Sequence, residues 1–112
     1  MEIITPGQIV EELQRLSREM DKGSGALYDA ECKLADSESH YDKQYSLAYL
    51  NSQGNIPDRQ AVAKLQTADD RLKADLARAE FNRVKQKMKM LSDQATMTAV
   101  MGRQVEMLWK HG

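Results

Sequence analysis

A single turn signal, Asn-Ser-Gln-Gly-Asn-Ile-Pro at residues 51–57, lies between two long tracts of helical periodicity. Two helices of roughly 45–55 residues joined by so short a loop must fold back on each other, and each is about 70–80 Å long at 1.5 Å per residue. So thin a hairpin cannot enclose a core by itself. We therefore expect an all-α fold, a long antiparallel, coiled-coil-like helical hairpin that associates with copies of itself or with another partner.

The length of 112 residues predicts one helical domain over 1–112. The net charge of −1 hides an asymmetry between the two arms of the hairpin. Residues 1–56 carry 5 Lys/Arg and 10 Asp/Glu, whereas residues 57–112 carry 11 and 7. The arms therefore attract each other, and any anionic partner is steered toward the second arm.

The first helix is expected over about residues 6–50. Thr5 is a good N-cap, Pro6 suits the first helical position, and Gln8 completes a capping box. Apolar side chains then recur every three or four residues, which is the seven-residue repeat of a coiled-coil seam. The seam consists of Leu13, Leu16, Met20, Leu27, Ala30, Leu34, Tyr41 and Ala48, with Gly23, Ser37 and Gln44 at weak positions.

Two glycines at positions 23 and 25 interrupt this seam and cost about 1 kcal/mol each relative to alanine inside a helix. The interruption fits either a continuous helix that is kinked at 23–25 or two helices joined by a loop. Met20 and Leu27 are seven residues apart, so the seam keeps its phase across the break. This phase favours the kinked helix and leaves the loop as the alternative.

A loop over 51–56 and a second helix over about 57–110 complete the hairpin, with Pro57 and Asp58 in the first turn. The expected apolar side of this helix consists of Val62, Leu65, Leu72, Leu76, Ala79, Val84, Met88, Leu91, Ala95, Val105 and Trp109. Between Leu65 and Leu76 the spacing is nearer eleven residues per three turns than seven per two. A loop centred near Gly54 places residue i opposite about 107 − i, so Leu34 should face Leu72.

The sequence argues against an enzyme. The two histidines, His40 and His111, lie in opposite arms, and no second ligand stands at metal-site spacing from either. There is no glycine-rich phosphate loop and no serine in a nucleophile-elbow context. We expect no catalytic residues, no metal and no cofactor.

The single cysteine, Cys32, excludes an intrachain disulfide and fits a reducing, intracellular location. The start of the chain lacks the features of a signal peptide, and no apolar run approaches the ~20 residues of a membrane span. We therefore expect a cytoplasmic protein without membrane contact.

Five cations within twelve residues of the second arm form the sharpest functional feature, because Glu80 is the only acid among them. They are Arg78, Arg83, Lys85, Lys87 and Lys89. One interpretation is a solvated face that complements the acidic first arm. The other is phosphate contact, since clustered Lys and Arg give sequence-independent, salt-dependent affinity for nucleic acid.

The end of the chain is rich in methionine and carries more apolar surface than one partner helix can cover. We expect a subunit interface there, formed by Met90, Met97, Met101, Val105, Met107, Leu108 and Trp109, with core filling as the alternative. Tyrosines at 41, 45 and 49 could stack on unpaired bases, but such a stripe more often packs between helices.

Several segments together carry a family resemblance: Tyr49-Leu50, the loop with Gly54, Asp58-Arg59-Gln60-Ala61, the basic Lys85–Lys89 stretch and Met101–Met107. Over residues 26–110 this layout resembles small helical proteins of tailed phages that are similar to phage recombination mediators. The resemblance implies an oligomeric helical hairpin that binds single-stranded DNA and helps load a recombinase onto strands coated by single-strand-binding protein. It also implies that DNA is contacted by Arg83, Lys85, Lys87 and Lys89. A phage-encoded protein of this kind would work in the cytoplasm of the host cell.

Two other classes of function remain open. A structural or adaptor coiled coil, such as a phage assembly factor, a chaperone or a protein-binding regulator, needs the same thin hairpin and excess apolar surface, but no DNA. A small effector that binds a host protein is a third possibility, which the sequence neither supports nor excludes.

Overall fold

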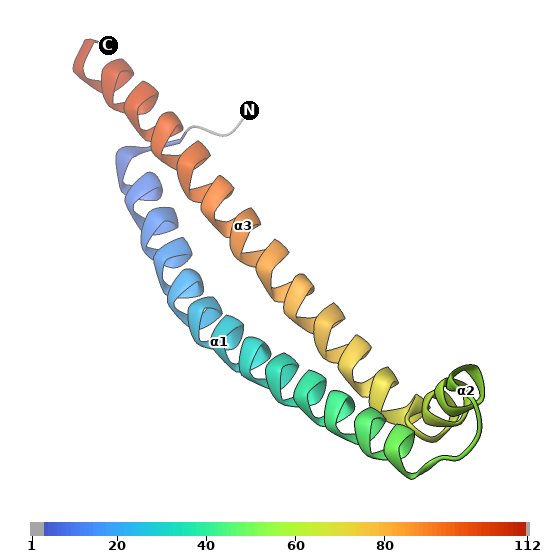
Figure 1. Ribbon diagram of the computed structural model, residues 1–112. Coiled ribbons are helices and arrows are strands. Elements are labelled where there is room, and N and C mark those ends of the chain that lie inside the picture. The colour runs from blue at the N-terminus through green and yellow to red at the C-terminus, as the bar shows by residue number, and fades with distance from the viewer. Residues whose placement is uncertain (1–3, 112) are drawn as a thin grey trace. The chain divides into compact units, whose positions relative to one another are not determined.

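The computed structural model describes residues 4–111, which form three α-helices and no strand (Figure 1). Helix α1 spans Pro6–Asn51, α2 spans Ile56–Gln66 and α3 spans Ala68–His111. The predicted all-α fold is confirmed. The prediction that the chain oligomerises stays a prediction, as does that of one domain over 1–112.

The packing divides the chain into two compact units, which we describe separately. The terminal unit comprises residues 1–26 and 84–112, and the loop unit comprises residues 27–83. In each unit a segment of α1 packs antiparallel against a segment of α3, which is the pairing expected of a helical hairpin.

The capping box predicted at the start of α1 is present. The backbone N–H of Thr5 donates to Gln8 Oε1 at 2.8 Å, and the N–H of Gln8 donates to Thr5 Oγ1 at 3.2 Å. These two bonds satisfy donors that the first turn of a helix leaves open. Farther along, α1 is α-helical throughout residues 22–25, so the alternative of a loop at the two glycines is wrong.

The seam of the terminal unit follows the predicted heptads of α1. Ile9 and Leu16 are buried, as is Leu91 of α3. Glycines occupy two seam positions and let the helices approach closely. A Cβ on Gly23 would collide with the Sδ of Met88, and one on Gly102 would lie 2.8 Å from a methyl carbon of Ile9.

These two glycine contacts correct the predicted register. A pairing of i with 107 − i puts residue 84 opposite Gly23 and residue 98 opposite Ile9, whereas the structure places Met88 and Gly102 there. In both pairs the partner lies four residues farther along α3, which is about one helical turn.

The seam of the loop unit is built largely from alanines, with Leu34 as the large exception. Ala30 and Leu34 of α1 are buried, and so are Ala63 of α2 and Ala74 and Ala77 of α3. Side chains this small let helix backbones approach closely, and a strict seven-residue spacing from Ala77 leads to Val84 and Leu91 on the continuing helix. The seam of α3 is therefore heptad-spaced.

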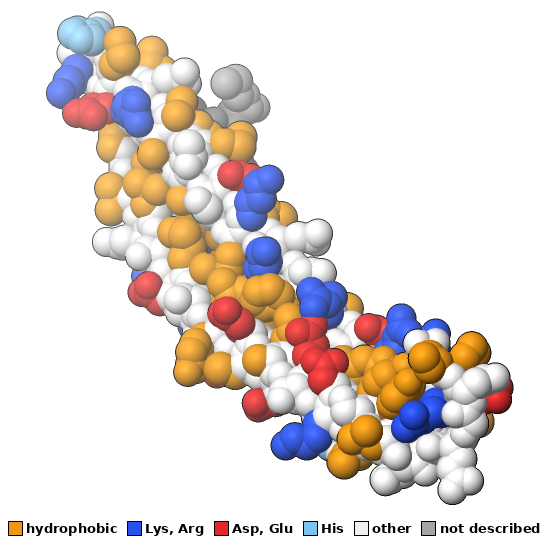
Figure 2. All heavy atoms as spheres, in the orientation of Figure 1, with side chains coloured by type: hydrophobic (Ala, Val, Ile, Leu, Met, Phe, Trp, Pro, Cys, Tyr) orange, Lys and Arg blue, Asp and Glu red, His pale blue; other side chains and the backbone are white. Residues whose placement is uncertain are grey.

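The large apolar residues predicted for this part of the seam lie outside it. Leu65 is 82% exposed, Leu72 is 56% exposed and Leu76 is 61% exposed. The predicted pairing of Leu34 with Leu72 and the eleven-residue spacing are therefore wrong. Figure 2 shows hydrophobic side chains at the surface on and around α2.

The loop after α1 is fixed by local hydrogen bonds. Gly54 adopts a positive φ of 111°, and Asn55 caps α2 by accepting the N–H of Asp58 at 3.0 Å. Arg59 donates through Nε and Nη2 to the carbonyl of Tyr49, at 3.3 and 3.1 Å, while its guanidinium lies 4.5 Å from the centre of the Tyr49 ring. The last turn of α1 contains no basic residue of its own, so Arg59 supplies the positive charge that suits the negative end of the helix dipole.

The second arm is not one helix over 57–110 as expected, because Thr67 separates α2 from α3. Its φ and ψ of −110° and 14° end α2, and its hydroxyl donates to the carbonyl of Ala63 at 2.6 Å. Asp69 and Asp70 then occupy the first turn of α3, where carboxylates suit the positive end of the helix dipole. The sequence signal for this break was Thr67 followed three residues later by Asp70.

Candidate nucleic-acid interface

The five candidate cations all lie on α3, but they belong to different units. Arg78 and Arg83 lie in the loop unit, whereas the three lysines, at 85, 87 and 89, lie in the terminal unit. The structure therefore does not bring the five together as one described site. Each group has its own surroundings.

Both arginines are engaged by carboxylates. Arg78 forms an ion pair with Glu38 of α1, which links the two helices of the loop unit. Arg83 donates twice to Glu80 on its own helix, with Nη2 3.0 Å from Oε1 and Nε 3.2 Å from Oε2. This hydrogen bonding lowers the pKa of Glu80 and raises that of Arg83. A phosphate would have to compete with these carboxylates.

Lys87 and Lys89 have a more favourable electrostatic setting than the two arginines. Lys85, Lys87 and Lys89 are exposed, and no acidic residue occurs between Val84 and Ser92. Lys85 and Lys89 are four residues apart and share one face of α3, while Lys87 lies on the opposite side. Among the described ion pairs none involves Lys87 or Lys89.

The terminal-unit segment of α3 is also cationic as a whole. Residues 84–111 contain five Lys/Arg and two Asp/Glu, a net charge of +3 with histidine neutral. One of the five cations, Lys110, pairs with Glu106 at 3.0 Å. The positive charge is thus concentrated toward the lysine cluster, which we define as Lys85, Lys87 and Lys89.

The tyrosines are used within the loop unit. Tyr41 and Tyr45 contact each other with ring centroids 6.1 Å apart and an interplanar angle of 60°, and Tyr49 lies under Arg59. All three are half-buried. These contacts favour packing over base stacking as their role.

Most of the residues predicted to form a subunit interface are exposed. Met90, Met97, Met107, Leu108 and Trp109 are each more than half exposed, and Met101 is also exposed, whereas Val105 is half-buried on the seam side of α3. The surface is apolar and accessible in the single chain, which is the condition that an interface requires. Whether another molecule covers it stays a prediction.

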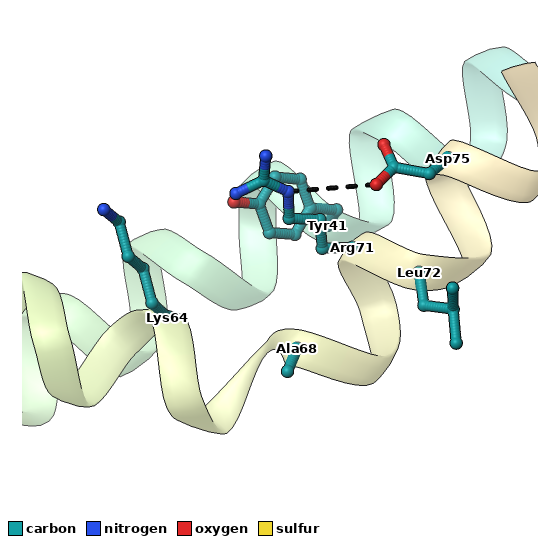
Figure 3. Close-up of a pocket in the computed structure, with 6 residues that line it drawn as sticks. All are labelled: Tyr41, Lys64, Ala68, Arg71, Leu72 and Asp75. Carbon is teal, nitrogen blue, oxygen red and sulfur yellow. Dashed lines mark ion pairs between the residues drawn. The ribbon is translucent and has the colours of Figure 1, made fainter.

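A hollow that the sequence did not predict lies at the break between α2 and α3 (Figure 3). It has a volume of about 270 Å³ and is lined by Tyr41, Lys64, Ala68, Arg71, Leu72 and Asp75. Arg71 points toward Asp75, with 3.9 Å between Nε and Oδ2, so the two charges largely neutralise each other.

Metal-ligand clusters and helices of membrane-spanning type are both absent from the described part of the chain. Residues 4–111 contain no cluster of three or more His, Cys, Asp or Glu side chains that could hold a metal ion. No helix among them has the length and apolar composition needed to cross a membrane.

Comparisons with protein-family models, curated proteins and solved structures found no match to this chain. The resemblance to phage recombination mediators therefore stays a prediction.

Proposed function

We propose that this chain is a non-enzymatic, self-associating helical protein that binds single-stranded DNA through the lysine cluster of α3. The observation that supports this proposal most strongly is the acid-free run from Val84 to Ser92, with Lys87 and Lys89 exposed and outside the described ion pairs. We do not include Arg78 and Arg83 among the proposed DNA-contacting residues, because each already has a carboxylate partner.

The proposed contact is to phosphates and not to bases. Lysines on a helix surface neutralise phosphate charge without reading sequence. The tyrosines that could stack on bases pack within the loop unit instead. We therefore expect affinity that depends strongly on salt and little on base composition.

The wider role follows from the family resemblance alone. We propose that the protein acts in phage DNA recombination or replication, where it assists the loading of a recombinase onto strands coated by single-strand-binding protein. Self-association would add several weak lysine contacts along one strand and so raise the apparent affinity.

Fluorescence anisotropy with a labelled single-stranded oligonucleotide at low salt tests the proposal. We expect binding by the wild type and at least a tenfold loss when Lys85, Lys87 and Lys89 are all replaced by glutamine. Glutamine keeps a high helix propensity, so the helix should persist. The matched control replaces Lys33, Lys43 and Lys73 of the loop unit by glutamine, which removes the same charge and should bind nearly as the wild type does.

Absence of wild-type binding at low salt would remove the proposal. Equal losses in the two triple variants would show that net charge, and not the lysine cluster, determines the affinity.

A second candidate function is a structural or adaptor coiled coil that contacts proteins and not DNA. It is favoured by the exposed leucines of the loop unit, Leu65, Leu72 and Leu76, because monomeric proteins rarely leave long apolar surfaces open. Specific capture of one purified protein partner, together with no DNA binding, would select this candidate.

A further inference from the structure

A second apolar stripe runs along α3 in the terminal unit, on a face that α1 does not cover. Its large apolar members are exposed, with Met97 66% and Leu108 71% accessible. The residues of this stripe, which we call the outer stripe, are Met90, Gln94, Met97, Met101, Gln104 and Leu108. Their spacing alternates between four and three residues, which is the spacing of a coiled-coil seam.

The order of residue types along the outer stripe is nearly the same whether it is followed from Met90 or from Leu108. From its start the order is Met, Gln, Met, and from its end the order is Leu, Gln, Met. The steps between neighbours are also symmetric about a point midway between Met97 and Met101. A surface with this symmetry can complement itself when two copies meet across a two-fold axis, as in an isologous interface.

We propose that a second copy of this chain packs on the outer stripe in antiparallel orientation. In this pairing Met97 lies opposite Met101 of the second copy, and Met90 lies opposite Leu108. Gln94 lies opposite Gln104, where each amide has both a donor and an acceptor for the other. The proposal deepens the proposed function, because it rests on self-association and names its geometry.

Charge selects the antiparallel orientation over the parallel one. The outer stripe contains no charged side chain, so neither orientation places a charge in the contact. A parallel pair would set the lysine clusters of the two copies side by side, and like charges so placed repel. In the antiparallel pair the cluster meets a single lysine of the other copy, Lys110, in place of three. The second Lys87 then lies about 36 Å away along the axis, at 1.5 Å per residue.

The size of the stripe predicts a weak dimer. From Met90 to Leu108 the stripe is about 27 Å long, and a helix is about 10–12 Å wide, so the covered strip measures about 300 Å². A standard interface buries about 800 Å² on each partner. Dimerisation should therefore depend on concentration in the micromolar range or above, unless DNA bridges the two copies.

This arrangement gives the proposed DNA contact a definite geometry. One dimer would offer two lysine clusters, one at each end of the paired stripes. A strand that reaches both would bind more tightly than a strand that reaches one, since the second contact is intramolecular. Short oligonucleotides that cannot span the two clusters should therefore bind more weakly than long ones.

Disulfide trapping between two single-cysteine chains tests the orientation. In a Cys32→Ser background, one chain carries Gln94→Cys and a second, with a different mass tag, carries Gln104→Cys. The antiparallel pair brings these positions to the level where a disulfide can form. When two Gln94→Cys chains pair with each other in the antiparallel orientation, their cysteines lie about 15 Å apart along the helix axis, which is too far for a disulfide. We expect the mixed disulfide on oxidation and little of either homodimer.

A dominant Gln94→Cys homodimer would show a parallel pair and overturn the proposal. Absence of any disulfide at hundreds of micromolar would overturn it as well.

Sedimentation equilibrium supplies the second readout. Met97→Glu with Met101→Glu should raise the dimer dissociation constant at least tenfold, whereas Ser92→Glu with Thr96→Glu, on another face of the same helix, should change it little. Equal effects of the two variants would overturn the proposal. Anisotropy on a short oligonucleotide separates the two ideas, because a monomer that still binds DNA leaves the proposed function standing without this dimer.

Discussion

Gly23 and Gly25 are two residues apart in α1 but have different surroundings. A Cβ on Gly23 would collide with Met88, whereas one on Gly25 would meet no atom within 4 Å. In a helix interior alanine is about 1 kcal/mol more favourable than glycine. The same substitution should therefore have different effects at the two positions.

We predict that Gly25→Ala stabilises the protein by about 1 kcal/mol, from helix propensity alone. Gly23→Ala should not show this stabilisation, because the added methyl group would force the Met88 side chain out of its position in the seam. Urea denaturation of both variants measures the difference. Adding Met88→Ala to Gly23→Ala should make the two changes non-additive, since the smaller side chain makes room for the new methyl group. Equal stabilisation by both alanines would contradict the described seam.

Two arginine–glutamate pairs within single helices make stability depend on pH. Hydrogen bonds from Arg15 lower the pKa of Glu12 below 4.5, and those from Arg83 do the same for Glu80. A carboxyl group whose pKa is lower in the folded state stabilises the fold above its unfolded pKa. This contribution is lost as the pH falls below about 4.5 toward the folded pKa.

We therefore predict that Glu12→Gln with Glu80→Gln flattens the loss of stability between pH 5 and pH 3, as measured by thermal unfolding. The effect should be small, because both carboxylates are in contact with solvent. Glu11→Gln is the matched control, since it removes a neighbouring carboxylate that has no arginine partner among the described contacts. A steeper loss of stability in the double variant than in the wild type would refute the assignment.

At the scale of the elements, local chemistry explains what the sequence could predict. Thr5 and Gln8 form the expected capping box, and Asn55 with Gly54 makes the expected loop. The heptads of α1 could be read because its seam contains large apolar residues such as Leu16 and Leu34. Each of these features depends on residues that are close in sequence.

The seam of α3 could not be read in the same way. Leu72 and Leu76 are more apolar than Ala74 and Ala77, so hydrophobicity alone assigns the leucines to the interior. The structure buries the alanines instead, because small side chains permit close approach, and it leaves the leucines exposed. The ion pair between Arg78 and Glu38 was likewise beyond prediction, because the predicted register places residue 69, and not Arg78, opposite Glu38.

Substitutions in the loop unit test this assignment directly. We predict that Leu72→Ala with Leu76→Ala lowers the free energy of unfolding by well under the ~2–5 kcal/mol typical of one buried leucine. Ala77→Leu should cost about 1–3 kcal/mol, because the added atoms overpack a filled seam. Urea denaturation at low protein concentration measures both. A larger loss from the leucine pair than from Ala77→Leu would restore the original assignment.

For the whole molecule, the acidic first arm and the cationic end of α3 suggest a division of roles. In the loop unit α1 and α3 are joined by Arg78–Glu38 and by His40–Asp70, whose Nε2 and Oδ1 are 3.2 Å apart. The terminal unit carries the lysine cluster and the outer stripe. On our proposals the terminal unit therefore provides the contacts with both DNA and a second copy.

The most direct test of the DNA proposal is the salt dependence of single-stranded DNA binding by the wild-type protein. Three lysines at phosphates predict a slope of about −2 for the logarithm of the binding constant against that of the salt concentration, per chain bound. The Lys85, Lys87 and Lys89 triple glutamine variant should lose most of this slope. A wild-type slope near zero, or one that the triple variant retains in full, would contradict the account.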